Sequence, residues 1–441
     1  MAQSSTTKIN VFRNKNFSLL FAGVLVSNIA HILFSFAISL YILSIASQVY
    51  GIERAALIQA LYLAANGVFL VLLMPFGGVF ADKLNKVTIM VWTDLVRAVI
   101  ILGIAYYLFT SPGVVSIIIV LFVMNVLLAI NSAFFNPASS SLLRFIVKDE
   151  ELQQAASYLQ GSHNLQALIG LILGGIMYAT MGIVWIFVVN GLGYLVSAFS
   201  ELFIRYDHKE HAGSDLTVKG MLADIRHGLG YLYGEKAIFT ILMMALALNF
   251  FLTPIFSNGM PFFIEFGLGR EPAYLFDGFM RPANWYSVIM IGFSLSAIFM
   301  SLFMSRQKTK ERYSPMLKKA LASMVGMIAL LSVLMIFYYL GVVPINAMLV
   351  SLAIIMFAVG VSQIAFNVPV QLIFQRKVDK TQLGKVNSVS AVLSQALVPL
   401  ASLVAGLLIS QISIIAFYLF CLIGMVVVLL LYMTNPNANL L

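Results

Sequence analysis

Long apolar runs separated by short polar segments follow one another along the chain. A helix rises about 1.5 Å per residue, so about 20 apolar residues cross a hydrocarbon layer about 30 Å thick. The runs therefore predict helices that span a membrane. We expect twelve, at residues 17–46, 55–81, 86–109, 114–135, 153–180, 182–204, 239–266, 285–305, 316–340, 343–366, 386–410 and 412–433.

The longest polar segment of the chain divides these helices into two groups of six. It predicts a domain of residues 1–204, a cytoplasmic linker of residues 205–238 and a second domain of residues 239–441. Apolar residues of the linker recur at helical spacing, which predicts an amphipathic helix on the membrane surface. The expected fold class is all-α and integral to the membrane, with twelve transmembrane helices in two pseudo-symmetric six-helix bundles.

An internal repeat supports this division. Four residues of the first half recur in the second half at a nearly constant offset, and we place each set in the loop before the fifth helix and in that helix. The pairs are Pro137 with Pro369, Leu152 with Leu383, Ser157 with Ser388, and Gly175 with Gly406. Repeated six-helix units occur in secondary transporters, where the substrate site lies between the repeats.

Composition and charge exclude several classes of protein. Apolar residues make up 61% of the chain and charged residues only 10%, too few to cover the surface of a soluble enzyme. The formal net charge of +9 does not predict nucleic-acid binding, because the basic residues are scattered between the apolar runs. All but four of the 26 Lys and Arg residues fall in loops on one side, which predicts that both termini are cytoplasmic.

Three ionisable residues within the predicted spans are candidates for proton coupling or for lining a substrate cavity. Asp94 and Arg97 share a face of the third helix, either as a neutralising pair or with Asp94 exchanging a proton as Arg97 changes partner. His31 lies near the middle of the first helix, and an unperturbed histidine titrates near pH 6.5. It serves either packing or function, the latter only if it faces a cavity. Glu201 and Glu265 lie near helix ends, and we expect them to be solvated.

The loop between the second and third helices carries a motif. Gly78 is followed by Asp82, Lys83 and Lys86, a spacing that resembles the loop signature of the major facilitator superfamily. A glycine here permits close helix approach, and Asp82 can pair with a cation when an inner gate is shut. The resemblance implies that these four residues form the inner-gate loop. The alternative is that the basic residues only anchor the loop on the cytoplasmic side.

Further stretches are similar to the macrolide-efflux-like branch of that superfamily, among them residues 92–98, 135–138 and 371–384. In the fifth helix, Gln166, Gly170, Gly174 and Gly175 resemble an exporter motif, with Gln166 in place of asparagine and Leu171 in place of proline. Gly170 and Gly174 also form a small-residue seam for helix packing.

Together, the residues and the resemblance imply a secondary active transporter of the plasma membrane that exports hydrophobic or amphipathic small molecules, drugs such as macrolides included, in exchange for protons. We expect a monomer surrounded by lipid, with no cofactor, no metal, no nucleic-acid partner and no enzymatic activity, since motifs for ATP binding, hydrolysis and metal ligation are absent. The alternatives are a transporter of a physiological lipid, peptide or siderophore, or a transporter-like sensor or scaffold. An intramembrane enzyme would need a nucleophile beside Asp94 and Arg97, and none is predicted there.

Overall fold

The computed structural model describes residues 11–206, 230, 233–268, 282–305, 312–377, 390 and 393–436. The first half contains η1 (Val11–Arg13), α1 (Lys15–Lys83), α2 (Lys86–Phe109), α3 (Val114–Ile146), α4 (Asp149–Thr180) and α5 (Ile183–Glu201). The second half contains α7 (Lys236–Pro254), η2 (Ile255–Gly259), α8 (Met260–Phe262), η3 (Phe263–Gly267), α9 (Pro282–Ser305), α10 (Ser314–Tyr339), α11 (Ile345–Lys377), α13 (Val398–Gln411) and α14 (Ile414–Thr434).

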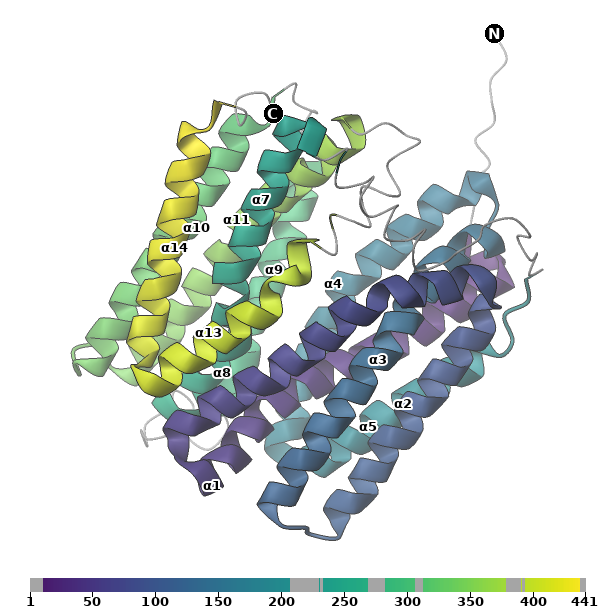
Figure 1. The fold of residues 1–441 in the computed structure, drawn as a ribbon, viewed down its shortest axis with the longest axis horizontal. Coiled ribbons are helices and arrows are strands. Elements are labelled where there is room, and N and C mark those ends of the chain that lie inside the picture. Colours follow the sequence, from purple (N-terminus) through teal and green to yellow (C-terminus); the bar gives the residue numbers. More distant parts are fainter. Residues whose placement is uncertain are drawn as a thin grey trace.

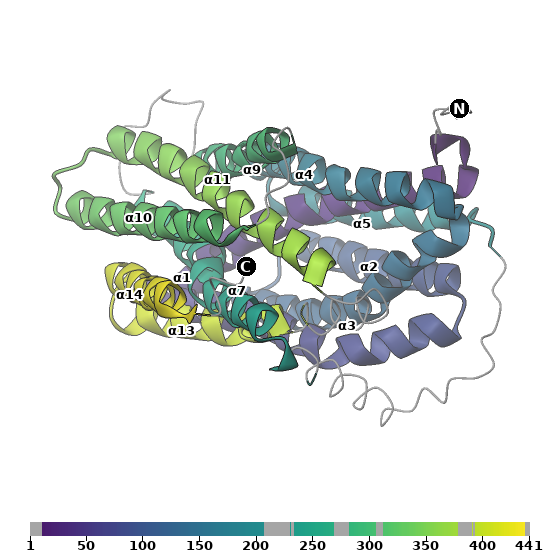
Figure 2. The ribbon, with the colours of Figure 1, turned by 90° about the horizontal axis from the view of Figure 1, so that it is seen from above.

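These helices form two bundles that lie side by side (Figures 1 and 2). In the first bundle α1 packs on α3, α4 and α5, and α2 packs between α3 and α5. In the second bundle α11 packs on α9 and α10, and α14 packs on α7 and α10. The bundles meet where α1 contacts α13 and where α4 contacts α9. The predicted all-helical fold of two six-helix bundles is confirmed.

The first two predicted spans are both contained in α1. Gly51 alone interrupts this helix, with φ 81° and ψ 162°, a backbone conformation that is essentially restricted to glycine. The chain reverses there, so the predicted loop between residues 46 and 55 is a single residue. We call the end of the molecule at Gly51 the turn end. The opposite end, where α1 begins and α14 ends, is the terminal end.

Proline lies inside the fourth helix of each half, at Pro137 of α3 and Pro369 of α11. Our placement of these prolines in the loop before the fifth helix is therefore wrong. A proline has no N–H to donate to the carbonyl four residues earlier, which here is that of Ala133. Gly77 of α1 packs against this carbonyl, and a Cβ on Gly77 would overlap it.

Gly77, rather than Gly78, permits the close contact between α1 and α3. A Cβ built on Gly78 meets no atom of the described residues within 4 Å, so the prediction that Gly78 allows helix approach is wrong. The two glycines are adjacent, and the helix rotates about 100° between them, which turns Gly78 away from α3. The position of the motif in the sequence does not reveal which of two neighbouring glycines faces the partner helix.

The adjacent residues Gly77 and Gly78 offer a matched test of the packing between α1 and α3. We expect Gly77→Ala to lower the free energy of unfolding by about 1–3 kcal/mol, because backbone atoms of α3 must move to admit the methyl group. Gly78→Ala should be neutral or stabilising by up to about 1 kcal/mol, since alanine favours the helix and meets no neighbour. Thermal unfolding of both variants in the same detergent measures the difference. Equal melting temperatures would contradict the contact.

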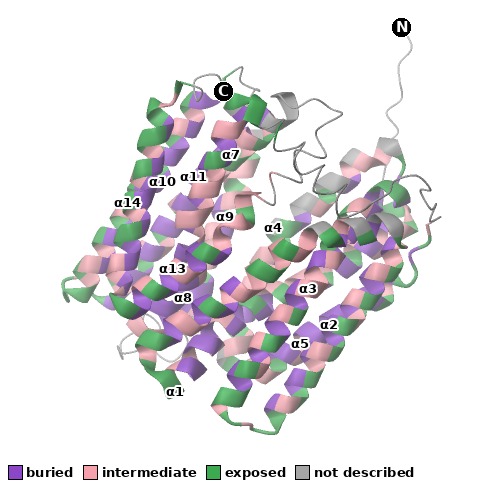
Figure 3. Cartoon of the chain, in the orientation of Figure 1, coloured by how far each residue is buried: buried purple, intermediate pink, exposed green. Residues whose placement is uncertain are grey.

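The outward faces of the helices carry many exposed residues (Figure 3), and large hydrophobic residues are among those that are exposed. On α2, for example, Val99 is 69% exposed and Tyr106 is 75% exposed. Ten described helical stretches are long and apolar enough to cross a membrane, and the first of them, Lys15–Met74, contains two spans. In α4 the apolar part is shorter, Leu165–Tyr178. The exposed apolar surface fits a chain whose surroundings are lipid.

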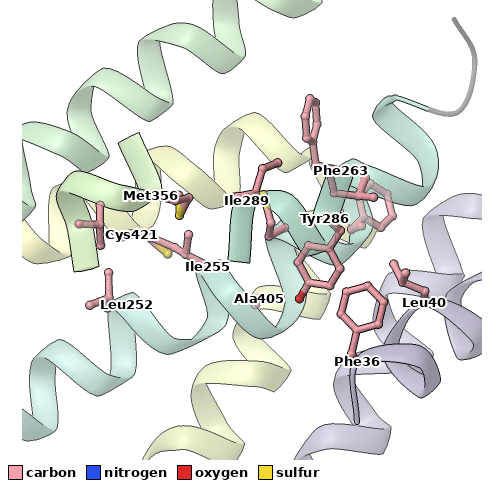
Figure 4. Close-up of a cluster of buried hydrophobic side chains, with 14 of the residues drawn as sticks. Phe36, Leu40, Leu252, Ile255, Phe263, Tyr286, Ile289, Met356, Ala405 and Cys421 are labelled. Atoms are coloured by element: carbon pink, nitrogen blue, oxygen red, sulfur yellow. The ribbon is translucent and has the colours of Figure 1, made fainter. Parts of the chain in front are cut away.

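The two bundles meet toward the turn end. Phe36 of α1 stacks on Tyr286 of α9, with ring centroids 4.8 Å apart (Figure 4). Gly406 of α13 packs against the methyl group of Ala60 and against the carbonyl of Ala56 in α1, and a Cβ on Gly406 would overlap the methyl group. The Phe36–Tyr286 contact is part of a continuous core that includes residues of both bundles.

Several predictions fall on residues that the structure does not describe. The proposed amphipathic helix of the linker lies almost wholly outside the described residues, so the domain limits at 204 and 239 stay predictions. The repeat partners Leu383 and Ser388 also lie outside them. The glycine pair is described: Gly175 is in α4 and Gly406 in α13, the fifth helix of each half.

Candidate functional site

Helix α2 carries a buried ion pair. The side chain of Asn85 caps the helix by accepting hydrogen bonds from the N–H groups of Val87 and Thr88. Asp94 lies eight residues after the start of α2, about 12 Å along its axis. It is fully buried, and its Oδ1 lies 2.9 Å from a guanidinium nitrogen of Arg97, which is 5% exposed. The predicted pairing of these two residues is confirmed.

Arg97 also contacts α3 and α5. Its second terminal nitrogen donates to the Ser132 hydroxyl at 3.1 Å. The guanidinium lies over the rings of Phe135 and Tyr194, 4.6 and 5.3 Å from their centroids. Such cation–π contacts favour a desolvated cation. Arg97 therefore links three helices of the first bundle, α2, α3 and α5.

His31 of α1 is connected to the same group of residues. Its Nδ1 lies 3.2 Å from the hydroxyl of Tyr194, whose ring contacts Arg97. Its Nε2 lies 3.4 Å from the hydroxyl of Ser35, one helical turn further along α1. The imidazole borders a cavity, which is the condition that sequence analysis set for a functional role.

This cavity has a volume of about 430 Å³ and lies among α1, α2, α3 and α5. Both of the α1 segments contribute to its wall, which mixes hydroxyl and amide groups with apolar side chains. The polar lining includes Ser27, Asn28, His31, Ser35, Ser39, Gln59, Asn66, Arg97, Asn125, Ser132 and Asn136, and the apolar lining includes Phe34, Ile38, Leu63, Leu70, Leu128 and Phe135.

Amide side chains in the cavity wall also hold the helices together. The amide of Asn66 donates to Asn125 Oδ1 at 3.0 Å, which joins the second segment of α1 to α3. Gln59 donates to the Ser39 hydroxyl at 2.7 Å, between the two segments of α1. Hydrogen bonds between helices satisfy polar groups that lipid cannot solvate.

The motif of the fifth helix packs α4 against α1. Gln166 is buried and accepts a hydrogen bond from the amide of Asn28 at 3.1 Å. Cβ atoms on Gly170 and Gly174 would meet α1 at Ile32 and Phe36, at 2.8 and 3.2 Å. The predicted packing seam is therefore confirmed, and Gly175 is buried beside it. None of these four residues borders the described cavity.

The loop that we predict to form the inner gate is short. Gly78, Asp82 and Lys83 lie in the last turns of α1, and only Leu84 and Asn85 separate that helix from α2. The side chains of Asp82 and Lys83 lie outside the description. Lys86 is buried, with its ammonium group 4.7 Å from the centroid of the Phe145 ring in α3. Its backbone N–H donates to the Tyr206 hydroxyl at 2.8 Å.

Glu201 is buried, contrary to our prediction. It is the last residue of α5, and we expected solvation, but its side chain is fully buried. The Ser197 hydroxyl donates to Glu201 Oε1 at 3.4 Å. The available signal was the spacing of Asn190, Ser197 and Glu201, which recur every one or two turns on the buried face of α5.

Comparisons with known proteins place this fold in a family. Residues 20–400 match the family described as the Major Facilitator Superfamily. The chain is 24% identical to the uncharacterised transporter YkuC of Bacillus subtilis (strain 168) over 60% of each chain. It is 23% identical to macrolide efflux protein A of Streptococcus pyogenes over 54% of this chain and 56% of that protein. The matches thus cover little more than half the length of these relatives.

Solved structures with low identity show the same fold. A bacterial homologue of the iron transporter ferroportin, in an inward-facing state, aligns with a TM-score of 0.69 at 14% identity, covering 97% of this chain and all of that one. The xylose transporter XylE from E. coli, in an inward-open conformation, aligns with a TM-score of 0.66 at 10% identity, covering 95% of both chains. The chain belongs to the Major Facilitator Superfamily and has the fold of its transporters.

Proposed function

We propose that the chain is a proton-coupled secondary transporter, an antiporter that exports hydrophobic or amphipathic small molecules by alternating access. The observation that carries this proposal is the position of Arg97, which lines the cavity and pairs with the buried Asp94. Protonation of Asp94 removes the negative charge that pairs with Arg97, and Arg97 borders the cavity. Proton binding at Asp94 and substrate binding in the cavity can therefore influence each other through Arg97.

The size and the lining of the cavity support the proposal that the substrate is a small organic molecule. Its volume falls within the roughly 300–1,000 Å³ of sites for drug-sized ligands. Its wall pairs aromatic and aliphatic side chains with amides and hydroxyls, which suits a molecule with both apolar and hydrogen-bonding parts. Similarity to macrolide efflux protein A and the exporter-like residues of α4 favour export over uptake. Multidrug transport is one form that this activity can take.

The contacts between the bundles support alternating access. Phe36 with Tyr286, and Ala60 with Gly406, join the bundles toward the turn end. With both termini in the cytoplasm, as the basic loops predict, the turn end faces outside, and these contacts close the outer entrance. Opening them while the inner-gate loop of Gly78, Asp82, Lys83 and Lys86 closes would expose the cavity to the outside.

Protons supply enough energy for this cycle. One proton moving down about 100 mV releases about 2.3 kcal/mol. One pH unit adds about 1.4 kcal/mol. Together they sustain a concentration ratio of several hundred, roughly, for a one-to-one exchange. A monomer in the plasma membrane, in contact with lipid and with small-molecule substrate, is sufficient for the mechanism, and neither nucleic acid nor a cofactor takes part.

Reconstitution tests the proposal directly. Purified protein in lipid vesicles is given an imposed pH gradient and a panel of labelled macrolides, lipids, peptides and siderophores. We expect accumulation of an amphipathic compound that collapses when an uncoupler is added. Accumulation that survives the uncoupler would overturn proton coupling. Binding without transport of any compound would favour the alternative of a sensor or scaffold.

Substitution of His31 separates a substrate role from a proton role. We expect His31→Gln to weaken substrate binding about tenfold, because the amide reproduces only part of the hydrogen bonding to Tyr194 and Ser35. The pH profile of transport between about pH 5 and 8 should keep its shape. Initial rates measured over that range, with His163→Gln on α4 as the control, check both expectations. A flattened profile would place His31 in the proton path.

A further inference from the structure

The interface between α2 and α5 buries two acidic side chains but only one basic side chain among the described residues. Asp94 and Glu201 are both fully buried, and Arg97 is the cation that acts on both of them. Ser197 lies between the acids, because its hydroxyl donates to Glu201 and also interacts with the Asp94 carboxyl. We call Asp94, Arg97, Ser197 and Glu201 the charge cluster.

Each carboxyl of the charge cluster has one oxygen without a partner. Asp94 Oδ1 is paired with Arg97, and Glu201 Oε1 accepts from Ser197, but Asp94 Oδ2 and Glu201 Oε2 are buried without a hydrogen bond from any described residue. Two ionised carboxylates beside one guanidinium would leave a net charge of −1 inside the protein, at a high cost in free energy. A proton on one acid removes that charge.

We infer that Asp94 and Glu201 hold one exchangeable proton between them, with Ser197 as the bridge and Glu201 as the acid from which the proton leaves. The inference deepens the proposed function and rests on it for its biological role. When the O–H bond of Glu201 breaks, the proton passes to water and a carboxylate remains. The second negative charge then competes with Asp94 for Arg97.

The position of Glu201 supports release of the proton from Glu201 toward the surface at the terminal end. A surface hollow of about 400 Å³ at the terminal end is lined by Asn85, which caps α2, by Val87 and Thr88 of α2, and by Ile204, Arg205 and Tyr206 after α5. Glu201 precedes this last group by three residues and accepts the N–H of Ile204 with its carbonyl. Arg97 lies on the other side of the pair, at the cavity. The acids thus lie between the cavity and the terminal surface.

The helices packed against α5 determine which other charges act on the pair. Helix α2 contributes Asp94 and Arg97, and α1 contributes His31, which contacts Tyr194. Helix α4 also packs on α5. It carries the exposed His163 and the half-buried Glu151, whose carboxylate accepts the N–H of Lys148. Within the described residues, therefore, Arg97 alone compensates the two acids directly.

Infrared spectroscopy of the purified full-length protein tests the inference without substrate. A protonated carboxyl has a C=O stretching band that a carboxylate lacks. At neutral pH we expect a band equivalent to one buried carboxyl in the wild type. Both Glu201→Gln and Asp94→Asn should abolish it, because one acid alone can ionise beside Arg97. Arg97→Met should double it, because neither acid then has a cation.

Glu235→Gln is the control, because it removes an exposed acid and should leave the C=O stretching band of the buried carboxyl unchanged. No band in the wild type, or a band that persists in Asp94→Asn, would overturn the shared proton. Both results are independent of transport. An intact band in a protein whose transport ignores the pH gradient would refute the proposed coupling while leaving the proton pair in place.

Discussion

Replacing Arg97 by methionine is expected to lower the free energy of unfolding by about 3–5 kcal/mol, because Asp94 must then be buried without its cation and has to take up a proton. The guanidinium pairs with Asp94, donates to Ser132 and lies over two aromatic rings, and methionine keeps only the apolar part of these contacts. Because a neutral Asp94 can be buried without a partner and a charged one cannot, the loss should shrink in acidic buffer.

Thermal unfolding in detergent at two pH values measures this effect. Arg144→Met is the matched control, because Arg144 is an exposed residue of α3. The double variant Asp94→Leu with Arg97→Met should recover part of the lost stability, since it buries neither charge. If the single and double variants unfold at the same temperature, the ion pair does not carry the stability that we assign to it.

Replacing Asp94 by asparagine is expected to abolish pH-driven transport while the protein stays folded. Asparagine has the same shape and keeps an oxygen that can accept from Arg97, but it cannot release a proton. The accumulation ratio sustained by a pH gradient of one unit should fall from a value of up to about 10 to about 1. Exchange of labelled for unlabelled substrate without a gradient should continue.

Vesicle transport with and without the gradient checks the prediction, and Glu235→Gln supplies a control that removes an exposed carboxylate. Under the shared-proton inference, Glu201 ionises in Asp94→Asn and keeps the charge cluster neutral, which explains why the fold survives. Driven accumulation equal to that of the wild type would exclude Asp94 from coupling.

Hydropathy predicted the helices well because lipid imposes one strict rule, that each crossing needs a long apolar helix. The same rule does not determine where helices end. Helix α3 continues eleven residues beyond the predicted boundary at 135, past Pro137, because Ile146 and its neighbours pack in a second core at the terminal end. Similarly, the reversal at Gly51 needs no loop, although the polar residues around it predicted one.

The candidate site was predictable in part. Asp94 and Arg97 stood out as charges within an apolar run, and their spacing on one helix was enough to predict the pair. Glu201 did not stand out, because nearness to a helix end suggested water, and it is the packing of α5 against its neighbouring helices that buries it. Residues such as Ser132 and Tyr194 join the site through tertiary contacts, which no pattern along the sequence reveals.

The single-residue reversal at Gly51 also bears on how the protein is made. Two helical segments joined by one glycine have no loop between them in the folded protein, so the bend has to form when the second segment packs on the first. We therefore expect the two segments to enter the bilayer together as a hairpin, with the bend leading. A bulkier residue at position 51 would oppose the bend and so delay the earliest step of biogenesis, before any other helix exists to help.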